Sequence, residues 1–205
     1  MLKINLKKIA EALIPSFYEA GKESIRLSGK NLKITIKKDN TPVTNGDLLV
    51  DEILQETISN LTPNIQIVSE ENVNEIKKFD NNNFWLIDPI DGTREYIKNK
   101  NEYTLNAALI LNKKPVLGVI YAPKLKRLFY SFGKNDAYEI NKNIKVKLNC
   151  KKLSKKNEIL ALSSDLWLPL IRLRTLRGRR PALLMRAVHI DALPQQVLRL
   201  SSLLV

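Results

Sequence analysis

Apolar residues recur at helical spacing in two segments near the start of the chain. Between Leu2 and Arg26 they fall at positions 4, 6, 9, 13, 14 and 17, and between Asp47 and Leu61 at positions 48, 50, 53, 54 and 58. Residues three or four positions apart lie on one face of an α-helix. Each segment therefore predicts an amphipathic helix.

Shorter apolar or alternating segments predict strands between and after these helices. Leu32–Ile36 alternates apolar and polar residues, which is typical of a strand. Apolar runs predict five further strands, at positions 65–69, 84–87, 103–111, 116–121 and 128–131. Asn112 to Lys114 reads as a hairpin turn, so the strands from Tyr103 onward should pair antiparallel. The pattern as a whole predicts a mixture of helix and strand, an α/β (α+β) fold.

Size and composition predict a soluble globular protein. The chain has 205 residues, 44% of them hydrophobic, which suffices for one good-sized domain or two small ones. Apolar runs reach only strand length, so neither a transmembrane span nor a signal peptide is expected. Cys150 is the only cysteine. An intramolecular disulfide is therefore excluded, which fits a cytoplasmic location.

The net charge of +13 raises the question of an anionic partner. Most lysines are interleaved with Ile, Leu and Asn along the first 160 residues, a pattern more typical of solvated faces than of a binding stripe. We therefore expect no nucleic-acid partner. A basic surface would still help to attract a small polyanionic substrate.

The residue composition changes abruptly near Ser163. Before this position there are 24 Lys and three Arg, and after it seven Arg and no Lys. This change predicts a boundary between a body at 1–162 and an Arg/Leu-rich tail at 163–205. A frameshift, an insertion or a fusion would each produce it. Alternatively, the tail could be a basic amphipathic segment that docks on a partner or peripherally on the inner membrane.

An apolar segment that ends in two aspartates carries the clearest chemical signal. Asp88 and Asp91 directly follow Trp85–Ile87 and are separated by Pro89 and Ile90. Two carboxylates that close repel one another unless a cation lies between them, so the pattern predicts a metal site of oxygen ligands. Pro89 is expected to fix a turn that directs both aspartates to one side, and the Ile90 carbonyl can supply a third oxygen.

Other residues could complete such a site. Glu70 and Glu71 end the preceding predicted strand and could converge on the same metal, and Asp47, before the second helix, is a third candidate. Gly92 and Thr93 are expected to open a helix, whose free N–H groups can bind phosphate. Taken singly, such acidic residues are most often a solvated pair or a helix cap. Their occurrence together favours a functional site.

In this order the motifs resemble the lithium-sensitive, magnesium-dependent phosphatases of the inositol monophosphatase superfamily. Four segments are similar to its 3′(2′),5′-bisphosphate nucleotidases, the CysQ type: Lys38-Asp-Asn-Thr-Pro-Val-Thr44, Val68-Ser-Glu-Glu71, Asp91-Gly-Thr-Arg-Glu-Tyr96 and Gly118-Val-Ile-Tyr-Ala-Pro123. The Arg-Glu-Tyr triplet favours this branch, because inositol phosphatases more often carry Thr-Asn-Phe. The resemblance covers roughly residues 5 to 160.

The resemblance implies a layered α/β sandwich with an antiparallel-rich sheet flanked by helices. It also implies an enzyme that hydrolyses a small nucleotide bisphosphate with two or three Mg²⁺ ions. It implies these site residues: metal ligands Glu70, Asp88, the Ile90 carbonyl and Asp91; catalytic residues Asp47, Glu71 and Thr93; and phosphate-binding amides at Gly92 and Thr93.

One family feature is missing from this sequence. Relatives carry a second domain with a Trp-Asp-x-Ala-Ala motif, whose aspartate completes the second metal site. Here Trp167 precedes Leu-Pro, and neither Asp165 nor Asp191 has the pattern around it. His189 is the only histidine and lies in the tail, which argues against a histidine triad or a zinc site. The chain thus resembles a truncated member, and impaired catalysis is expected.

Three alternatives stay open at this point. The closest is an inositol or sugar monophosphatase. A second is a non-catalytic remnant that binds magnesium weakly. The third is a protein whose basic tail binds nucleic acid or membrane. The sequence predicts neither the oligomeric state nor the specificity for base or sugar.

Overall fold

Residues 4–37, 40–72 and 82–149 are described by a computed structural model. They belong to a compact unit that spans Met1–Asn149. Cys150 and the tail predicted at 163–205 lie outside the described residues, so the boundary near Ser163 stays a prediction. The elements are α1 (Leu6–Leu27), a 3-10 helix (Gly29–Asn31), β1 (Ile34–Ile36), β2 (Pro42–Thr44), α2 (Asn45–Leu61), β3 (Gln66–Ser69), β4 (Asn83–Asp91), α3 (Thr93–Ile97), β5 (Thr104–Leu111), β6 (Lys114–Ala122), β7 (Arg127–Phe132), β8 (Asp136–Asn141) and β9 (Ile144–Lys147).

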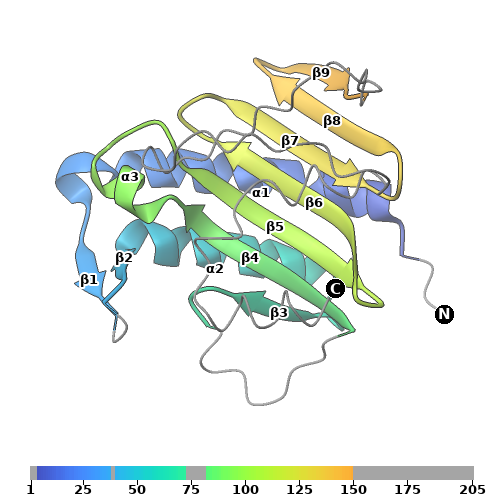
Figure 1. Ribbon diagram of the computed structural model, residues 1–205, viewed down its shortest axis with the longest axis horizontal. Helices are drawn as coiled ribbons and strands as arrows, with labels where there is room; N and C mark the ends of the chain where they lie inside the picture. Colours follow the sequence, from blue (N-terminus) through green and yellow to red (C-terminus); the bar gives the residue numbers. More distant parts are fainter. Residues whose placement is uncertain (1–3, 38–39, 73–81, 150–205) are drawn as a thin grey trace, which may run out of the picture. The chain divides into compact units, whose positions relative to one another are not determined.

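Seven strands form one sheet in the order β3-β4-β5-β6-β7-β8-β9. Only β3 and β4 pair in parallel, and every later neighbour is antiparallel (Figure 1). The antiparallel pairing predicted from Tyr103 onward is confirmed. Asn112 and Lys113 both have positive φ, 52° and 61°, which a two-residue hairpin of the type I′ class requires.

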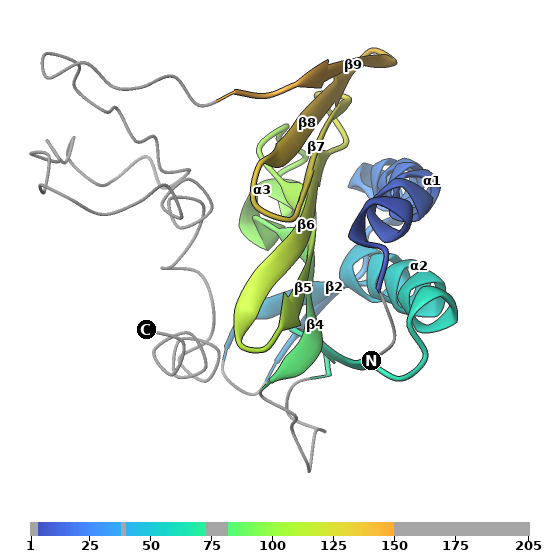
Figure 2. The ribbon, with the colours of Figure 1, turned by 90° about the vertical axis from the view of Figure 1, so that its right-hand side faces the viewer.

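Both long helices cover the same face of this sheet, as Figure 2 shows. The amphipathic patterns are confirmed at most positions, because the buried face of α1 includes Leu13 and Phe17 and that of α2 includes Leu54 and Ile58. Two positions of the patterns differ: Ile4 precedes α1, and Leu48 is exposed on α2. These side chains join one core with the sheet residues Trp85, Leu105, Leu109, Val119 and Leu128. The mixed α/β architecture, with helices packed on an antiparallel-rich sheet, agrees with the prediction. Among the described residues, no helix combines the length and apolar content needed to cross a membrane.

Several element boundaries differ from the prediction. The first helix was expected from Leu2, but among the described residues it begins at Leu6, because the Asn5 side chain accepts a hydrogen bond from the N–H of Lys8 and caps the helix. β1 starts at Ile34 instead of Leu32, and it pairs with the unpredicted β2 in a separate hairpin. β8 and β9 were also missed, because polar residues interrupt their apolar ones; β8 is half-buried and β9 is exposed.

Candidate metal site

Glu70 and Asp88 lie side by side because of the one parallel strand pair. Ser69 of β3 pairs with Ile87 of β4, and the N–H of Glu70 donates to the Ile87 carbonyl at 3.1 Å. The carboxyl ends of parallel strands meet at one edge of a sheet. The structure therefore brings Glu70 to Asp88 from a neighbouring strand end, as the sequence predicted.

Asp88 and Asp91 share a face of the sheet because β4 bulges between them. Asp88 pairs with Asn106 and Asp91 with Thr104, so three steps along β4 match two steps along β5. Two residues, Pro89 and Ile90, oppose one, which defines a β-bulge. The turn expected at Pro89 is therefore wrong, since the strand continues through Asp91. The expected consequence, two aspartates on one side, is confirmed.

The carboxylates perturb one another strongly. Burial raises the pKa of Asp88 well above its usual range, and the negative charges of Asp91, Glu70 and Asp47 raise it further. Burial raises the pKa of Glu70 to about 7, although the Lys37 cation partly offsets this effect. Glu70, Asp88, Asp91 and Asp47 therefore lie near enough for the charge of one to affect the pKa of another.

Asp47 occupies the first turn of α2 and has two roles. Its Oδ2 accepts hydrogen bonds from the Thr44 backbone N–H, at 2.8 Å, and from the Thr44 hydroxyl, while Thr44 caps the helix in return. Asp47 thus takes part in helix capping, although as the third helical residue of a capping box and not as the N-cap, which is Thr44. The second oxygen, Oδ1, lies 3.4 Å from the Thr93 hydroxyl. Burial raises the pKa of Asp47 to about 6, against the opposing effect of the bonds from Thr44.

Gly92 and Thr93 connect the end of β4 to α3. Gly92 has φ = +94°, and a Cβ there would lie 2.8 Å from the Glu102 carbonyl oxygen, so only glycine fits this turn. The helix expected at Thr93 is confirmed but has only five residues. The Thr93 hydroxyl can donate either to Ile90 O, at 3.1 Å, or to Asp47 Oδ1.

Glu71 is paired with a lysine that the sequence did not single out. Lys37, directly after β1, places its ammonium 2.9 Å and 3.0 Å from the two carboxylate oxygens of Glu71, and 3.7 Å from Glu70. The sequence feature that could have revealed Lys37 is its position: it directly precedes the motif that begins at Lys38, ten residues before Asp47.

Asn106 is a second residue that sequence reasoning missed. Its side-chain Nδ2 donates to Asp91 Oδ2 at 3.5 Å, from the strand position paired with Asp88. A polar residue inside the apolar strand Thr104–Leu111 was the signal that could have revealed it.

The donor atoms fit a hard divalent cation. All are oxygens, the ligand type that Mg²⁺ and Ca²⁺ prefer. Asp88 Oδ1 is buried and has no hydrogen-bond partner within the described residues, as expected for an atom that binds a cation. In the described part of the chain, however, no three acidic, histidine or cysteine side chains are already arranged as a ligand set. Small side-chain movements would therefore accompany metal binding.

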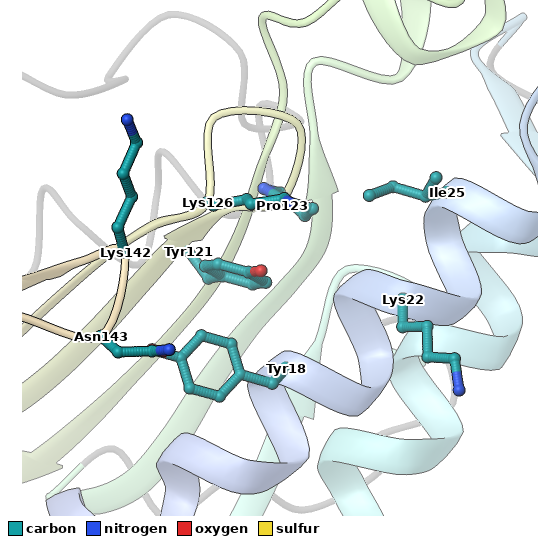
Figure 3. Close-up of a pocket in the computed structure, with 8 residues that line it drawn as sticks. All are labelled: Tyr18, Lys22, Ile25, Tyr121, Pro123, Lys126, Lys142 and Asn143. Atoms are coloured by element: carbon teal, nitrogen blue, oxygen red, sulfur yellow. The ribbon is translucent and has the colours of Figure 1, made fainter.

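A cavity of about 600 Å³ lies elsewhere, between α1 and two hairpin turns. Tyr18 and Tyr121 meet edge to face in it, and three of its lining residues are lysines. In Figure 3 the side chains of Lys22 and Lys142 extend away from each other. None of the predicted site residues lines this cavity.

Curated proteins of known activity resemble the chain in sequence. The chain is 36% identical over 135 residues to the 3′(2′),5′-bisphosphate nucleotidase CysQ of Haemophilus influenzae, covering 64% of this chain and 49% of that protein. It is 42% identical over 104 residues to CysQ of Salmonella typhimurium, covering 50% and 42%. The chain spans about half the length of the curated relatives that it matches.

Solved structures share the fold. Thermotoga maritima IMPase superposes with a TM-score of 0.58 at 23% identity, covering 71% of this chain and 54% of that chain. An IMPase/NADP phosphatase complexed with Mg²⁺ and phosphate superposes with a TM-score of 0.56 at 26% identity, covering 66% and 52%. The model of the inositol monophosphatase family matches residues 5–165. The chain therefore belongs to the inositol monophosphatase family.

Proposed function

We propose that this chain provides the metal-binding part of a Mg²⁺-dependent phosphomonoesterase that acts on a nucleotide 3′(2′),5′-bisphosphate. The observation that carries the proposal is the buried, unpartnered Asp88 Oδ1, which lies on β4 beside the end of β3, where Glu70 follows, and on the same face as Asp91. The substrate class follows from the CysQ relatives, which are named as bisphosphate nucleotidases.

Glu70, Asp88, Asp91 and the Ile90 carbonyl would hold the metal ions. When bound, Mg²⁺ supplies positive charge that stabilises the charge developing on a phosphoryl group. The Ile90 carbonyl can contribute even though Thr93 donates to it, because a carbonyl oxygen has two lone pairs. Like-charge repulsion disfavours the fully ionised cluster without a cation, so the carboxylates are poised for cation binding.

Asp47, Thr93 and Glu71 would orient the attacking water and accept its proton. The Thr93 hydroxyl lies within reach of Asp47 Oδ1 and can pass its hydrogen to that oxygen while it accepts one from water. Glu71, oriented by Lys37, would accept a proton at a carboxylate oxygen. The backbone N–H groups of Gly92 and Thr93 would bind phosphate oxygens, since these residues begin α3 and N–H groups at a helix start can bind anions.

Phosphate release from 3′-phosphoadenosine 5′-phosphate tests this proposal, with inositol 1-phosphate as the comparison substrate. Release should require Mg²⁺, stop on addition of EDTA and be faster with the bisphosphate. Asp88→Asn should abolish it. Asp136→Asn is the matched control, because Asp136 lies on β8, where its exposed side chain pairs with Lys147, and this variant should retain activity. EDTA-resistant release would contradict the proposal. Failure to hydrolyse either substrate would favour the non-catalytic remnant.

A further inference from the structure

Two buried side-chain oxygens on paired residues of β4 and β5 have no hydrogen-bond partner. Asp88 and Asn106 are directly opposite in the antiparallel register. Within the described chain, the Oδ1 atoms of both are buried and unpartnered. Cross-strand neighbours lie close enough for their side chains to interact. Since buried acceptors without donors are rare and costly, two adjacent ones indicate that a bound group supplies positive charge there.

The orientation of the Asn106 amide follows from its other contact. Nδ2 donates to Asp91 Oδ2, so the amide nitrogen faces the carboxylate. The reversed orientation would place the amide oxygen against a carboxylate oxygen, two acceptors in contact. Oδ1 is therefore left free to bind something other than Asp91.

We propose that Asn106 is a further ligand residue of the divalent-cation site: Nδ2 holds Asp91 in place, and Oδ1 binds the hydrated cation beside Asp88. This inference rests on the proposed function, because it assumes the same cation. A neutral amide suits the position chemically. Asp88, Asp91 and Glu70 already repel one another, and an amide oxygen adds a ligand without adding negative charge.

Mn²⁺ binding to the full chain, followed by the EPR signal of the free ion, tests the proposal without requiring turnover. Asn106→Leu keeps the size of the side chain and removes both polar atoms. Asn141→Leu is the matched control, because Asn141 is exposed at the end of β8, four strands away from β4. The dissociation constant should rise at least about tenfold in Asn106→Leu, as found for residues that support metal sites, and stay unchanged in Asn141→Leu.

A second measurement separates a ligand from a residue that only positions Asp91. In the unmodified chain, Mg²⁺ titration should shift the side-chain carbonyl ¹³C NMR signal of Asn106 with the same midpoint as the protein's overall Mg²⁺ binding. The amide hydrogens face Asp91 and would respond in either case. The carbonyl carbon of a residue acting only through Asp91 would show little change, because its oxygen would meet no cation. This measurement needs no variant, so it decides the matter even if Asn106→Leu fails to fold.

The outcomes distinguish this inference from the proposed function. If the unmodified chain binds neither Mn²⁺ nor Mg²⁺ at millimolar concentration, the metal site itself is wrong. If it binds both, but Asn106→Leu binds Mn²⁺ equally well or the Asn106 side-chain carbonyl signal does not respond, the metal site stands and the role of Asn106 as a ligand is refuted. Weakened binding together with a shifted carbonyl signal supports it.

Discussion

Asp88 and Asp91 lie on the same face of β4, although an odd number of positions separates them along a strand. The β-bulge between them restores the alternation, because two residues of β4 oppose one residue of β5 at this point. Negative charge is thereby concentrated at a buried strand end, where Glu70 and Asp47 add to it. We therefore expect a divalent cation to stabilise the protein by relieving the repulsion between these carboxylates.

Replacing Asp88 with Asn should stabilise the metal-free protein. The change removes a carboxyl group whose charged form is disfavoured in the folded state by burial and by three other carboxylates, so the free energy of unfolding in EDTA should rise by about 1 to 2 kcal/mol. Mg²⁺ should raise the melting temperature of the parent protein but not that of Asp88→Asn. Asp136→Asn should retain the response to Mg²⁺. Urea unfolding and thermal melting provide both readouts. A loss of stability of Asp88→Asn in EDTA would show that the cluster is not repulsive.

Acidification should also stabilise the metal-free protein. Asp47 and Glu70 have folded-state pKa values of about 6 and about 7, above those of an unfolded chain. The folded state therefore binds more protons between pH 4.5 and 7, and stability falls as the pH rises through this window. In EDTA, unfolding free energy should be higher at about pH 5 than at about pH 7.5, by on the order of 2 kcal/mol.

Glu70→Gln provides the control for this pH effect, because it removes one of the two titrating groups. Its stability should vary less between about pH 5 and about pH 7.5 than that of the parent. Saturating Mg²⁺ should likewise reduce the dependence, since a bound cation favours the ionised carboxylates. A stability that rises from pH 5 to pH 7.5 in EDTA would contradict the assignment of raised pKa values.

Removing the Lys37 ammonium should strengthen cation binding. This group lies against Glu71 and Glu70, where it competes electrostatically with a metal ion. Lys37→Met should lower the Mn²⁺ dissociation constant by roughly three- to tenfold at low ionic strength. Lys33→Met makes the same change at an exposed position just before β1 and should have a smaller effect. Weaker Mn²⁺ binding by Lys37→Met would mean that the lysine helps to build the site.

Gly92 should tolerate substitution less well than Gly133. Both have positive φ, +94° and +65°, so alanine is strained at either position. A Cβ at Gly133 meets nothing within 4 Å, whereas at Gly92 it would lie 2.8 Å from the Glu102 carbonyl oxygen. Gly133→Ala should cost about 1 kcal/mol of stability, and Gly92→Ala about 2 to 3 kcal/mol. Equal costs in urea unfolding would show that the loop relaxes around the new methyl group.

Much of the fold could be predicted from periodicity. The faces of α1 and α2 and the apolar strands from Phe84 onward were visible because burial against a core imposes regular spacing. β2, β8 and β9 were not, since β2 has only three residues and the apolar residues of β8 and β9 are separated by polar ones. Their place in the fold depends on pairing with neighbouring strands. Pairing partners are non-local and leave little trace in a single sequence.

The acidic residues of the site could be predicted because their chemistry is unusual at strand ends. Lys37 and Asn106 could not, because each becomes informative only through a partner distant in sequence. Lys37 meets Glu71 across the fold, and Asn106 is placed opposite Asp88 by the register of β4 and β5. The bulge at Pro89 was interpreted as a turn, since proline occurs in turns and, within sheets, at bulges.

Anomalous diffraction from crystals soaked in Mn²⁺, recorded at the manganese edge, would locate the proposed metal site. A peak is expected at the end of β4, with carboxylate oxygens of Glu70, Asp88 and Asp91 at about 2.1 to 2.3 Å, the range for a small hard cation. The side chains should have moved together relative to the metal-free arrangement, with Asp88 Oδ1 among the ligands. A crystal that shows no peak there at saturating Mn²⁺, or one with its manganese bound only by other residues, would contradict the account.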